Sequence, residues 1–184
     1  MRDPEPLPNF LIVSGNGRDS GKTGFITRLI RQTAQQQKIT AIKVSPHLHP
    51  GSNPNGLLLK TDHYILAKEI IKGNRKDSAR MLEAGAHEVY YIEATDEHLP
   101  EAFETFRKLI PVKGPVVCES GGLRDIINPS LFIMINRNDG RPDKKGFVQR
   151  LPLADLLIVF NGHDYDLHAE RIRFDGSSWK YQNE

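Results

Sequence analysis

The chain contains one cysteine, no long apolar run and little excess of charge of either sign. Cys118 alone cannot form an internal disulfide, and it has no neighbours at the spacing of a cysteine metal site. No stretch approaches the ~18 consecutive apolar residues of a membrane-spanning helix, and residues 1–6 lack the apolar segment of a signal peptide. These absences predict a cytoplasmic protein without a membrane partner.

Charge is nearly balanced, with 25 Lys and Arg residues against 23 Asp and Glu residues and a formal net charge of +2. Proteins that bind nucleic acid usually concentrate a cationic excess on one face, so we expect no nucleic-acid partner, although the balance still allows a local basic pocket. The 38% of apolar residues excludes a wholly disordered chain. With no linker or internal repeat in 184 residues, one domain over residues 1–184 is expected.

Short apolar runs alternate with segments of helical spacing. Strands are predicted where β-branched residues form runs too short for a helix, and helices where apolar residues recur three and four positions apart. The predicted strands are 10–13, 39–44, 89–94, 116–119, 131–135 and 156–160, and the predicted helices are 25–34, 77–85 and 99–110. This alternation favours an α/β fold of three layers, with helices on both faces of a mostly parallel sheet.

Two further segments complete the pattern. Between residues 45 and 74 strand and helix interpretations compete, because a stretch rich in Pro and Gly is followed by apolar runs of mixed character. Near the carboxyl terminus, residues 172–174 and 179–181 flank the turn-forming sequence 175–178. That arrangement predicts a terminal β-hairpin.

The strongest chemical signal is the segment 15–23, Gly-Asn-Gly-Arg-Asp-Ser-Gly-Lys-Thr, between a predicted strand and a predicted helix. In such a turn, converging backbone N–H groups, the positive helix end, a Lys ammonium and a hydroxyl bind phosphate and Mg²⁺. The alternative is a glycine-rich turn with an ordinary surface lysine, but the series of elements favours nucleotide binding. The spacing departs by one residue from the standard motif, because Asn16 stands where that motif has glycine.

A second signal is the segment 116–123, an apolar strand that ends in Glu119 and continues into Ser-Gly-Gly. A carboxylate at the carboxyl end of a parallel strand lies beside the loop after the first strand, where it can hold Mg²⁺ or its water. A solvated acidic residue is the alternative. We therefore expect Lys22 and Glu119 to be catalytic, and Thr23 and Glu119 to be metal ligands.

Several segments resemble those of known families. The loop 15–23 resembles the longer phosphate loop of dethiobiotin synthetases and their cobyrinic acid amidase relatives, and 116–123 is similar to their strand ending in Glu. The segment 76–89, with its Lys-Asp-Ser, Arg and Ala-Gly-Ala, resembles the helix-to-strand passage of the molybdopterin-guanine dinucleotide biosynthesis protein B family. Ile42-Lys43, followed by two histidines, is also similar to that family, and the resemblance covers about residues 10–160.

The resemblance to the biosynthesis protein B family implies a P-loop NTPase fold. It also implies a GTP-binding homodimer that assists attachment of a guanine nucleotide to molybdopterin, with molybdopterin and a cofactor-biosynthesis protein as partners. The loop spacing and the Glu-Ser-Gly-Gly turn are closer to the synthetases, which implies instead an ATP-dependent ligase that activates a carboxylate. A third interpretation is a non-catalytic module whose partner affinity is controlled by nucleotide. In each case the expected cofactor is Mg²⁺ with GTP or ATP.

Individual roles follow from this reading. Lys22 is expected to contact β- and γ-phosphate oxygens while Thr23 coordinates Mg²⁺. Lys43 meets a phosphate or an acidic substrate, or is a solvated charge at a strand end. Asp164, which ends the sequence Asn-Gly-His-Asp, can accept two N–H bonds from guanine, although a polar turn is the alternative. The residues expected to bind nucleotide are Gly15, Gly17, Asp19, Ser20, Gly21, Lys22, Thr23, Gly24, Lys43 and Asp164.

Five further polar residues have two interpretations each. Asp77 and Ser78 either position substrate or Mg²⁺, or cap the helix that follows them. Arg80 binds an anion or pairs with a carboxylate one helical turn away. His47 and His49 can both face a metal from an extended segment, but without a third ligand of clear spacing an exposed loop is favoured.

Overall fold

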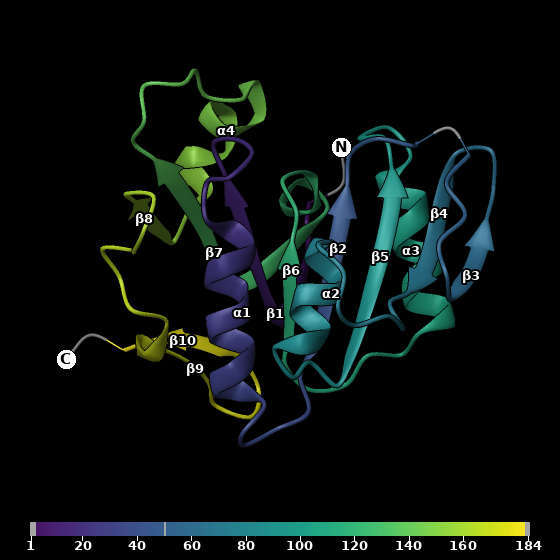
Figure 1. The fold of residues 1–184 in the computed structure, drawn as a ribbon, viewed down its shortest axis with the longest axis horizontal. Coiled ribbons are helices and arrows are strands. Elements are labelled where there is room, and N and C mark those ends of the chain that lie inside the picture. The colour runs from purple at the N-terminus through teal and green to yellow at the C-terminus, as the bar shows by residue number, and fades with distance from the viewer. Residues whose placement is uncertain (1–2, 50, 183–184) are drawn as a thin grey trace.

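Eight strands form one mixed sheet in a computed structural model of the chain, which describes residues 3–49 and 51–182 (Figure 1). The strands lie in the order β3-β4-β5-β2-β6-β1-β7-β8. Six neighbouring strands, β5, β2, β6, β1, β7 and β8, run parallel to one another. At one edge β4 pairs antiparallel with β5, and β3 pairs antiparallel with β4. The strands of this sheet are β1 (Glu5–Gly15), β2 (Thr40–Ser45), β3 (Leu57–Lys60), β4 (Tyr64–Lys68), β5 (Glu88–Ala94), β6 (Val116–Glu119), β7 (Ile127–Arg137) and β8 (Leu156–Phe160).

Helices cover both faces of the sheet, and a short hairpin follows it. The helices are α1 (Lys22–Thr33), α2 (Asp77–Glu83), α3 (Leu99–Leu109) and α4 (Lys145–Arg150), and short 3₁₀ turns lie at Gly122–Asp125, Leu151–Leu153 and Ala169–Arg171. The antiparallel hairpin consists of β9 (Ile172–Phe174) and β10 (Trp179–Tyr181). The predicted α/β class, mostly parallel sheet and terminal hairpin are thereby confirmed. No helix among the described residues is both long enough and apolar enough to cross a membrane.

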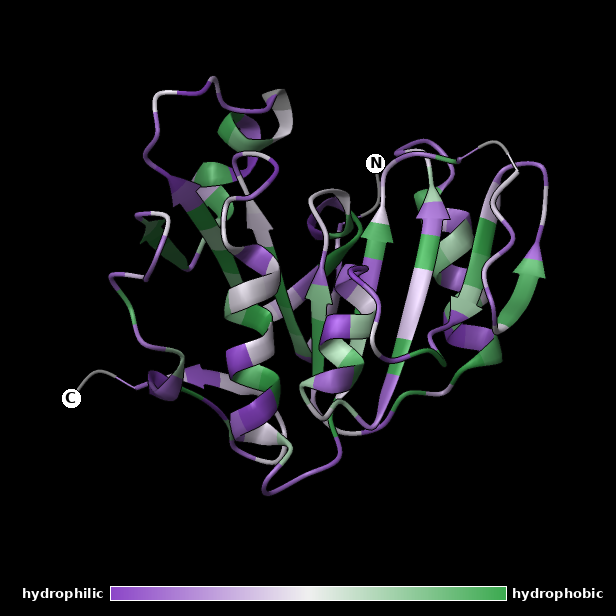
Figure 2. Ribbon diagram, in the orientation of Figure 1, coloured by the Kyte–Doolittle hydropathy of each residue, from purple (hydrophilic) through white to green (hydrophobic). Residues whose placement is uncertain are grey.

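The central strand β1 contributes to two hydrophobic cores, one on each face of the sheet. Leu11 and Val13 pack in the core formed with α1, α2 and the hairpin, whereas Phe10 and Ile12 pack in the core formed with α3. All four are at most 4% exposed. A parallel strand buried on both faces has an uninterrupted apolar sequence, which is why residues 10–13 show no alternation. Figure 2 shows hydrophobic positions, in green, along the neighbouring strands as well.

The sheet order brings the carboxyl ends of three strands together. β6 lies between β2 and β1, so that Lys43 of β2 and Val13 of β1 both pair in register with Glu119 of β6. Because these strands are parallel, the loops that leave their carboxyl ends share one edge of the sheet. That edge receives the glycine-rich segment 15–21 directly from β1.

The segment between residues 45 and 74 contains strands, so the helix interpretation is wrong there. β4 is buried between β3 and β5, which gives it the continuous apolar sequence that periodicity alone cannot separate from a helix. Gly56 has a φ of 74°, and a Cβ there would overlap the Lys68 carbonyl oxygen. Helix α4 was not predicted, because it is only six residues long and follows a polar stretch.

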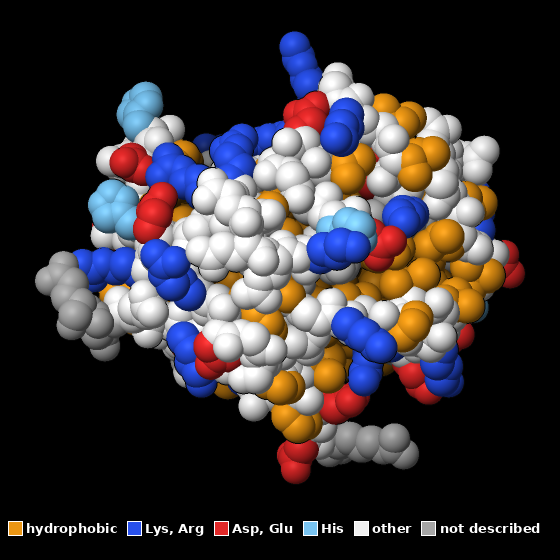
Figure 3. Space-filling view, turned by 90° about the horizontal axis from the view of Figure 1, so that it is seen from below, with side chains coloured by type: hydrophobic (Ala, Val, Ile, Leu, Met, Phe, Trp, Pro, Cys, Tyr) orange, Lys and Arg blue, Asp and Glu red, His pale blue; other side chains and the backbone are white. Residues whose placement is uncertain are grey.

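Charge is mixed on the side of the molecule that lies opposite the carboxyl ends of the parallel strands. Figure 3 views this side from below, and Lys and Arg side chains alternate there with Asp and Glu. Hydrophobic side chains gather toward the side of the sheet occupied by β3 and α3. Leu57 and Leu58 of the edge strand β3 are 41% and 43% exposed, and Leu109 at the end of α3 is 52% exposed.

The terminal hairpin is anchored by Trp179, which is 1% exposed. Its indole Nε1 donates to the carbonyl oxygens of Asn9, at 3.0 Å, and Val116, at 3.1 Å. Its ring also meets that of Phe174 edge to face, with 5.5 Å between centroids. The hairpin therefore closes one end of the core that also contains α1.

We expect Trp179→Ala to lower the free energy of unfolding by about 3–5 kcal/mol, because it leaves a cavity and removes the donor from two carbonyls. Urea unfolding followed by circular dichroism measures the change. Leu109→Ala is the matched control, since removal of a half-exposed side chain is expected to change the free energy by about 0.5 kcal/mol or less. Equal losses in the two variants would show that the hairpin is not part of the core.

Candidate functional site

The glycine-rich loop between β1 and α1 has two positions that accept only glycine. A Cβ on Gly15 would lie 2.5 Å from the Ser20 hydroxyl oxygen and 3.0 Å from the Ile135 carbonyl oxygen. Gly21 precedes α1 in the left-handed conformation, with a φ of 86°. A Cβ there would lie within 2.9 Å of the rings of Phe160 and Tyr165. Glycine at these two positions allows the two ends of the loop to approach each other, and it allows the loop to pack against Phe160 and Tyr165.

Asn16, the residue that departs from the standard motif, fastens the loop to the end of β7. It is 4% exposed, and its amide nitrogen lies 2.7 Å from Asn136 Oδ1 and 3.0 Å from both the Arg137 carbonyl oxygen and Asp143 Oδ1. Its amide oxygen accepts the Arg137 backbone N–H at 3.1 Å. The Asn16 carbonyl also accepts the backbone N–H of Lys144, so residues after β7 lie against the loop. This role of Asn16 is not visible in the sequence, where the residue is only a change in the spacing of the motif.

Lys22 folds back over the loop that precedes it. Its ammonium donates to the Gly17 carbonyl oxygen at 2.6 Å and to the Ser20 hydroxyl at 3.0 Å. Ser20 is fully buried and donates to the same Gly17 carbonyl at 3.1 Å. Burial lowers the pKa of Lys22, and the nearby Glu119 opposes this shift. An anion beside Lys22 would stabilise its charged form.

Thr23, Lys43 and Asp77 meet around the buried carboxylate of Glu119, which is 3% exposed. Thr23 donates its hydroxyl to Glu119 Oε2 at 2.8 Å. The Lys43 ammonium donates to Glu119 Oε1 at 2.6 Å and to Asp77 Oδ2 at 2.8 Å. Burial acts to lower the pKa of Lys43, but the two carboxylates outweigh it and the pKa is raised. Lys43 is therefore not a solvated charge, and Glu119 is not a solvated acid.

Asp77 and Ser78 do not cap α2, so that interpretation is wrong. The helix begins at Asp77, its flanking residue is Lys76, and no side chain caps it. Asp77 instead faces Lys43, whose attraction lowers the Asp77 pKa although burial alone would raise it. Ser78 is buried and donates its hydroxyl to Glu69 Oε2 at 2.6 Å. Both side chains serve contacts between α2 and the sheet.

The oxygen atoms of Thr23 and Glu119 suit Mg²⁺, a hard cation that prefers oxygen ligands and usually keeps several waters. Across residues 3–49 and 51–182, no group of three His, Cys, Asp or Glu side chains is placed to hold a metal by itself. His49 contacts a carboxylate, with its Nδ1 3.3 Å from Glu93 Oε1, rather than facing a metal cluster.

Asp164 does not join the cluster around Glu119. Its carboxylate forms an ion pair with Arg28 of α1, with 2.7 Å between Arg28 Nη1 and Asp164 Oδ1. The next residue, Tyr165, donates its hydroxyl to the Gly21 carbonyl oxygen at 2.5 Å, and a Cβ on Gly24 would lie 2.6 Å from that hydroxyl. The chain after β8 therefore touches the glycine-rich loop through Tyr165, a contact that no local sequence signal indicates.

The remaining loop residues lie at the surface or its border. Asp19 is exposed and adopts a left-handed conformation, with a φ of 55°. Gly17 is half-buried, and its carbonyl oxygen receives both Lys22 and Ser20. Of the predicted nucleotide-binding residues, the structure thus gathers those of 15–24 with Lys43, and it places Asp164 beside them on a separate loop.

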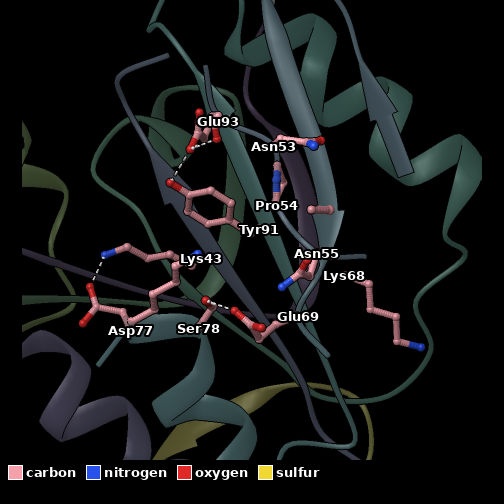
Figure 4. Close-up of a pocket in the computed structure, with 13 residues that line it drawn as sticks. Lys43, Asn53, Pro54, Asn55, Lys68, Glu69, Asp77, Ser78, Tyr91 and Glu93 are labelled. Carbon is pink, nitrogen blue, oxygen red and sulfur yellow. Dashed lines mark hydrogen bonds and ion pairs between the residues drawn. The ribbon is translucent and has the colours of Figure 1, made fainter. Parts of the chain in front are cut away.

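A pocket of about 420 Å³ adjoins this cluster and shares Lys43 and Asp77 with it (Figure 4). The pocket lies between β2, β4 and β5, the start of α2 and the segment that precedes β3. Its lining consists of Lys43, Ser52, Asn53, Pro54, Asn55, Ala67, Lys68, Glu69, Lys76, Asp77, Ser78, Tyr91 and Glu93. The site therefore has two adjoining compartments, the glycine-rich loop and this pocket.

We expect Lys43→Met to lower the free energy of unfolding by about 3 kcal/mol near neutral pH, because it leaves the buried Glu119 without its cation. The raised pKa of Lys43 means that its contribution is lost only as the pH rises through that pKa, above the ordinary lysine range. The lowered pKa of Asp77 means that its contribution is lost only as the pH falls through that pKa, below the ordinary aspartate range.

The destabilisation is therefore expected to be constant between about pH 6 and 9 and to shrink below about pH 4. Urea unfolding of both proteins across this range measures it. Lys68→Met is the matched control, because Lys68 and Glu88 form a pair with side chains 39% and 33% exposed. Such a pair is worth about 1 kcal/mol or less. A Lys43→Met protein no less stable than Lys68→Met would contradict the role of Lys43.

Comparisons with protein-family models, with curated proteins and with solved structures found no significant match to this chain. The interpretation of the site therefore rests on the loop 15–24 and on its contacts with Lys43 and Glu119.

Proposed function

We propose that the chain binds a nucleoside triphosphate with Mg²⁺ through residues 15–24 and hydrolyses it slowly, as a P-loop NTPase. The observation that supports this most is the meeting of Lys22, Thr23 and Glu119 where the glycine-rich loop enters α1. This set supplies an ammonium, a hydroxyl and a carboxylate within one turn of a helix N-terminus, which is the donor set that phosphate and Mg²⁺ together require.

The contacts of Lys22 suggest how phosphate is received. Its ammonium is satisfied by two neutral oxygens, those of Gly17 and Ser20, in a position where burial disfavours the charge. Phosphate oxygens are stronger acceptors for an ammonium than carbonyl or hydroxyl oxygens. We infer that Lys22 leaves the Gly17 carbonyl for the β- and γ-phosphates, while the backbone N–H groups of residues 20–22 donate to the same oxygens.

Thr23 and Glu119 would hold Mg²⁺, which neutralises charge on the phosphates when it is bound. The Lys43 ammonium donates to Glu119 Oε1 and fixes the position of that oxygen. Because Glu119 is 3% exposed and forms an ion pair with Lys43, this carboxylate is poorly placed to take a proton from water. Slow hydrolysis is the turnover that such an arrangement supports.

Guanine is the base we favour, through Asp164. Its ion pair with Arg28 joins side chains that are 56% and 38% exposed, so water competes for both groups and the pair separates readily. Asn161 Oδ1 accepts the backbone N–H groups of His163 and Asp164, both at 2.9 Å, which fixes the turn that presents the carboxylate. The Tyr165 hydroxyl holds this turn against the loop that would bind phosphate.

We further infer, from the resemblance of residues 10–160 to the biosynthesis protein B family, a role in attaching a guanine nucleotide to molybdopterin, together with a partner protein. The exposed Leu57 and Leu58 at the free edge of the sheet support the homodimer that this resemblance implies. The pocket that shares Lys43 with the phosphate site favours an enzyme with a second substrate over a purely nucleotide-controlled module. That observation also keeps an ATP-dependent ligase as the second candidate.

Lys22→Ala is expected to weaken the binding of Mg²⁺-nucleotide at least tenfold, equivalent to about 1.4 kcal/mol. Isothermal titration calorimetry with a non-hydrolysable triphosphate, in Mg²⁺ and in EDTA, measures the loss. Lys108→Ala is the matched control, because Lys108 is 72% exposed on α3 and is expected to have no effect. Unchanged affinity in the Lys22 variant would remove the basis of the proposed function.

Asp164→Asn is expected to weaken GTP binding about tenfold and to leave ATP binding unchanged, because an amide cannot accept both N–H groups of guanine. Competition between the two nucleotides on wild type and variant gives the preference directly. Asp166→Asn, which changes a neighbouring carboxylate on the same loop, is the control. Tighter binding of ATP than GTP by the wild type would favour the ligase over the guanine-nucleotide role.

A further inference from the structure

The pocket beside the phosphate site has an anionic group buried in its wall. Glu93 of β5 is 3% exposed and lines the pocket. Its Oε1 accepts the hydroxyls of Tyr91, at 2.9 Å, and Ser52, at 3.0 Å, and its Oε2 accepts the His49 backbone N–H at 3.3 Å. The His49 imidazole also lies 3.3 Å from Oε1 but is itself largely exposed. The other three donors to Glu93 are neutral hydroxyl and backbone N–H groups.

A second carboxylate lies at the opposite end of the pocket, as Figure 4 shows. Glu69 Oε2 accepts the Ser78 hydroxyl at 2.6 Å, and Oε1 accepts the Ile71 backbone N–H at 3.0 Å. Both partners are again uncharged. The two ends of the pocket thus each present a carboxylate that is fixed in position but lacks a full countercharge from these donors.

The cations of the pocket are committed elsewhere or lie at its margin. Lys43 donates to Asp77 and Glu119, and these two carboxylates balance its charge. Lys68 points to Glu88, 2.7 Å away and outside the pocket lining. Lys76 is exposed. The interior therefore favours a positively charged guest over a negatively charged one.

We propose that this pocket binds a small organic cation that carries amino or guanidino groups, as the second substrate of the chain. Glu93 and Glu69 would accept its N–H groups, and the exposed residues Asn53 and Asn55 also line the pocket. That the cation lies next to the terminal phosphate of a nucleotide rests on the proposed function, since it depends on the shared Lys43. The binding of a cation in the pocket does not rest on the proposed function.

The test titrates the nucleotide-free protein at pH 8 with 1,4-diaminobutane and agmatine as cationic probes, and with succinate and glutarate as anionic ones of similar length. We expect the better cation to bind one site with a Kd below about 1 mM and at least tenfold more tightly than either diacid. Glu93→Gln and Glu69→Gln are each expected to weaken it at least fivefold. Glu97→Gln, at an exposed position outside the lining, is expected to leave it unchanged.

The outcomes separate this proposal from the nucleotide site. Binding of a cation by the Lys22→Ala protein as tightly as by the wild type supports the pocket even if nucleotide binding fails in every protein. Absence of binding by both cations, equal or tighter binding of a diacid, or equal loss in Glu97→Gln and the two pocket variants would each overturn it. Glu69→Gln keeps the test decisive if circular dichroism shows that the change at the buried Glu93 prevents folding.

Discussion

The ion pair between Lys43 and Glu119 is the interaction on which the rest of the site depends. A buried carboxylate is costly unless it is paired and hydrogen-bonded, and Glu119 meets both conditions only because β6 lies between β2 and β1. The same contact reaches α1 through Thr23 and α2 through Asp77. One buried charge therefore fixes the relative positions of two strands, two helices and the glycine-rich loop, so that folding and the geometry of the site cannot be separated.

Much of this was visible in local sequence. Strands such as 116–119 are short apolar runs because both faces of the sheet are covered, and α1 has the expected apolar stripe. Glu119 was found because a residue at the carboxyl end of a parallel strand must lie near the loop after the first strand, whatever the details of packing. These inferences depend on periodicity and on the handedness and direction of the chain, which short segments already encode.

What local sequence missed depends on contacts between distant residues. In the sequence Asn16 is only a departure from the standard motif, whereas in the structure its amide fastens the loop to residues 136, 137 and 143. For Asp77 the sequence left open a role in positioning substrate or Mg²⁺ and a role as a helix cap, and only the fold shows that Lys43 lies beside it. Tyr165 gave no signal, since its hydrogen bond to Gly21 joins positions 144 residues apart. In each case the residue type is common, and its structural role is determined by a partner that is distant in the sequence.

The small net charge of +2 conceals a separation of charge between the two compartments of the site. Lys22 at the glycine-rich loop meets only neutral acceptors, and Glu93 in the adjoining pocket meets mainly neutral donors. Lys43 stands between them, held by carboxylates on either side. An anion at the loop and a cation in the pocket would each satisfy the charge of its own compartment and attract the other across Lys43 and Asp77. Under the proposed function and the proposed cation site, this arrangement favours simultaneous occupation of the two compartments by ligands of opposite charge.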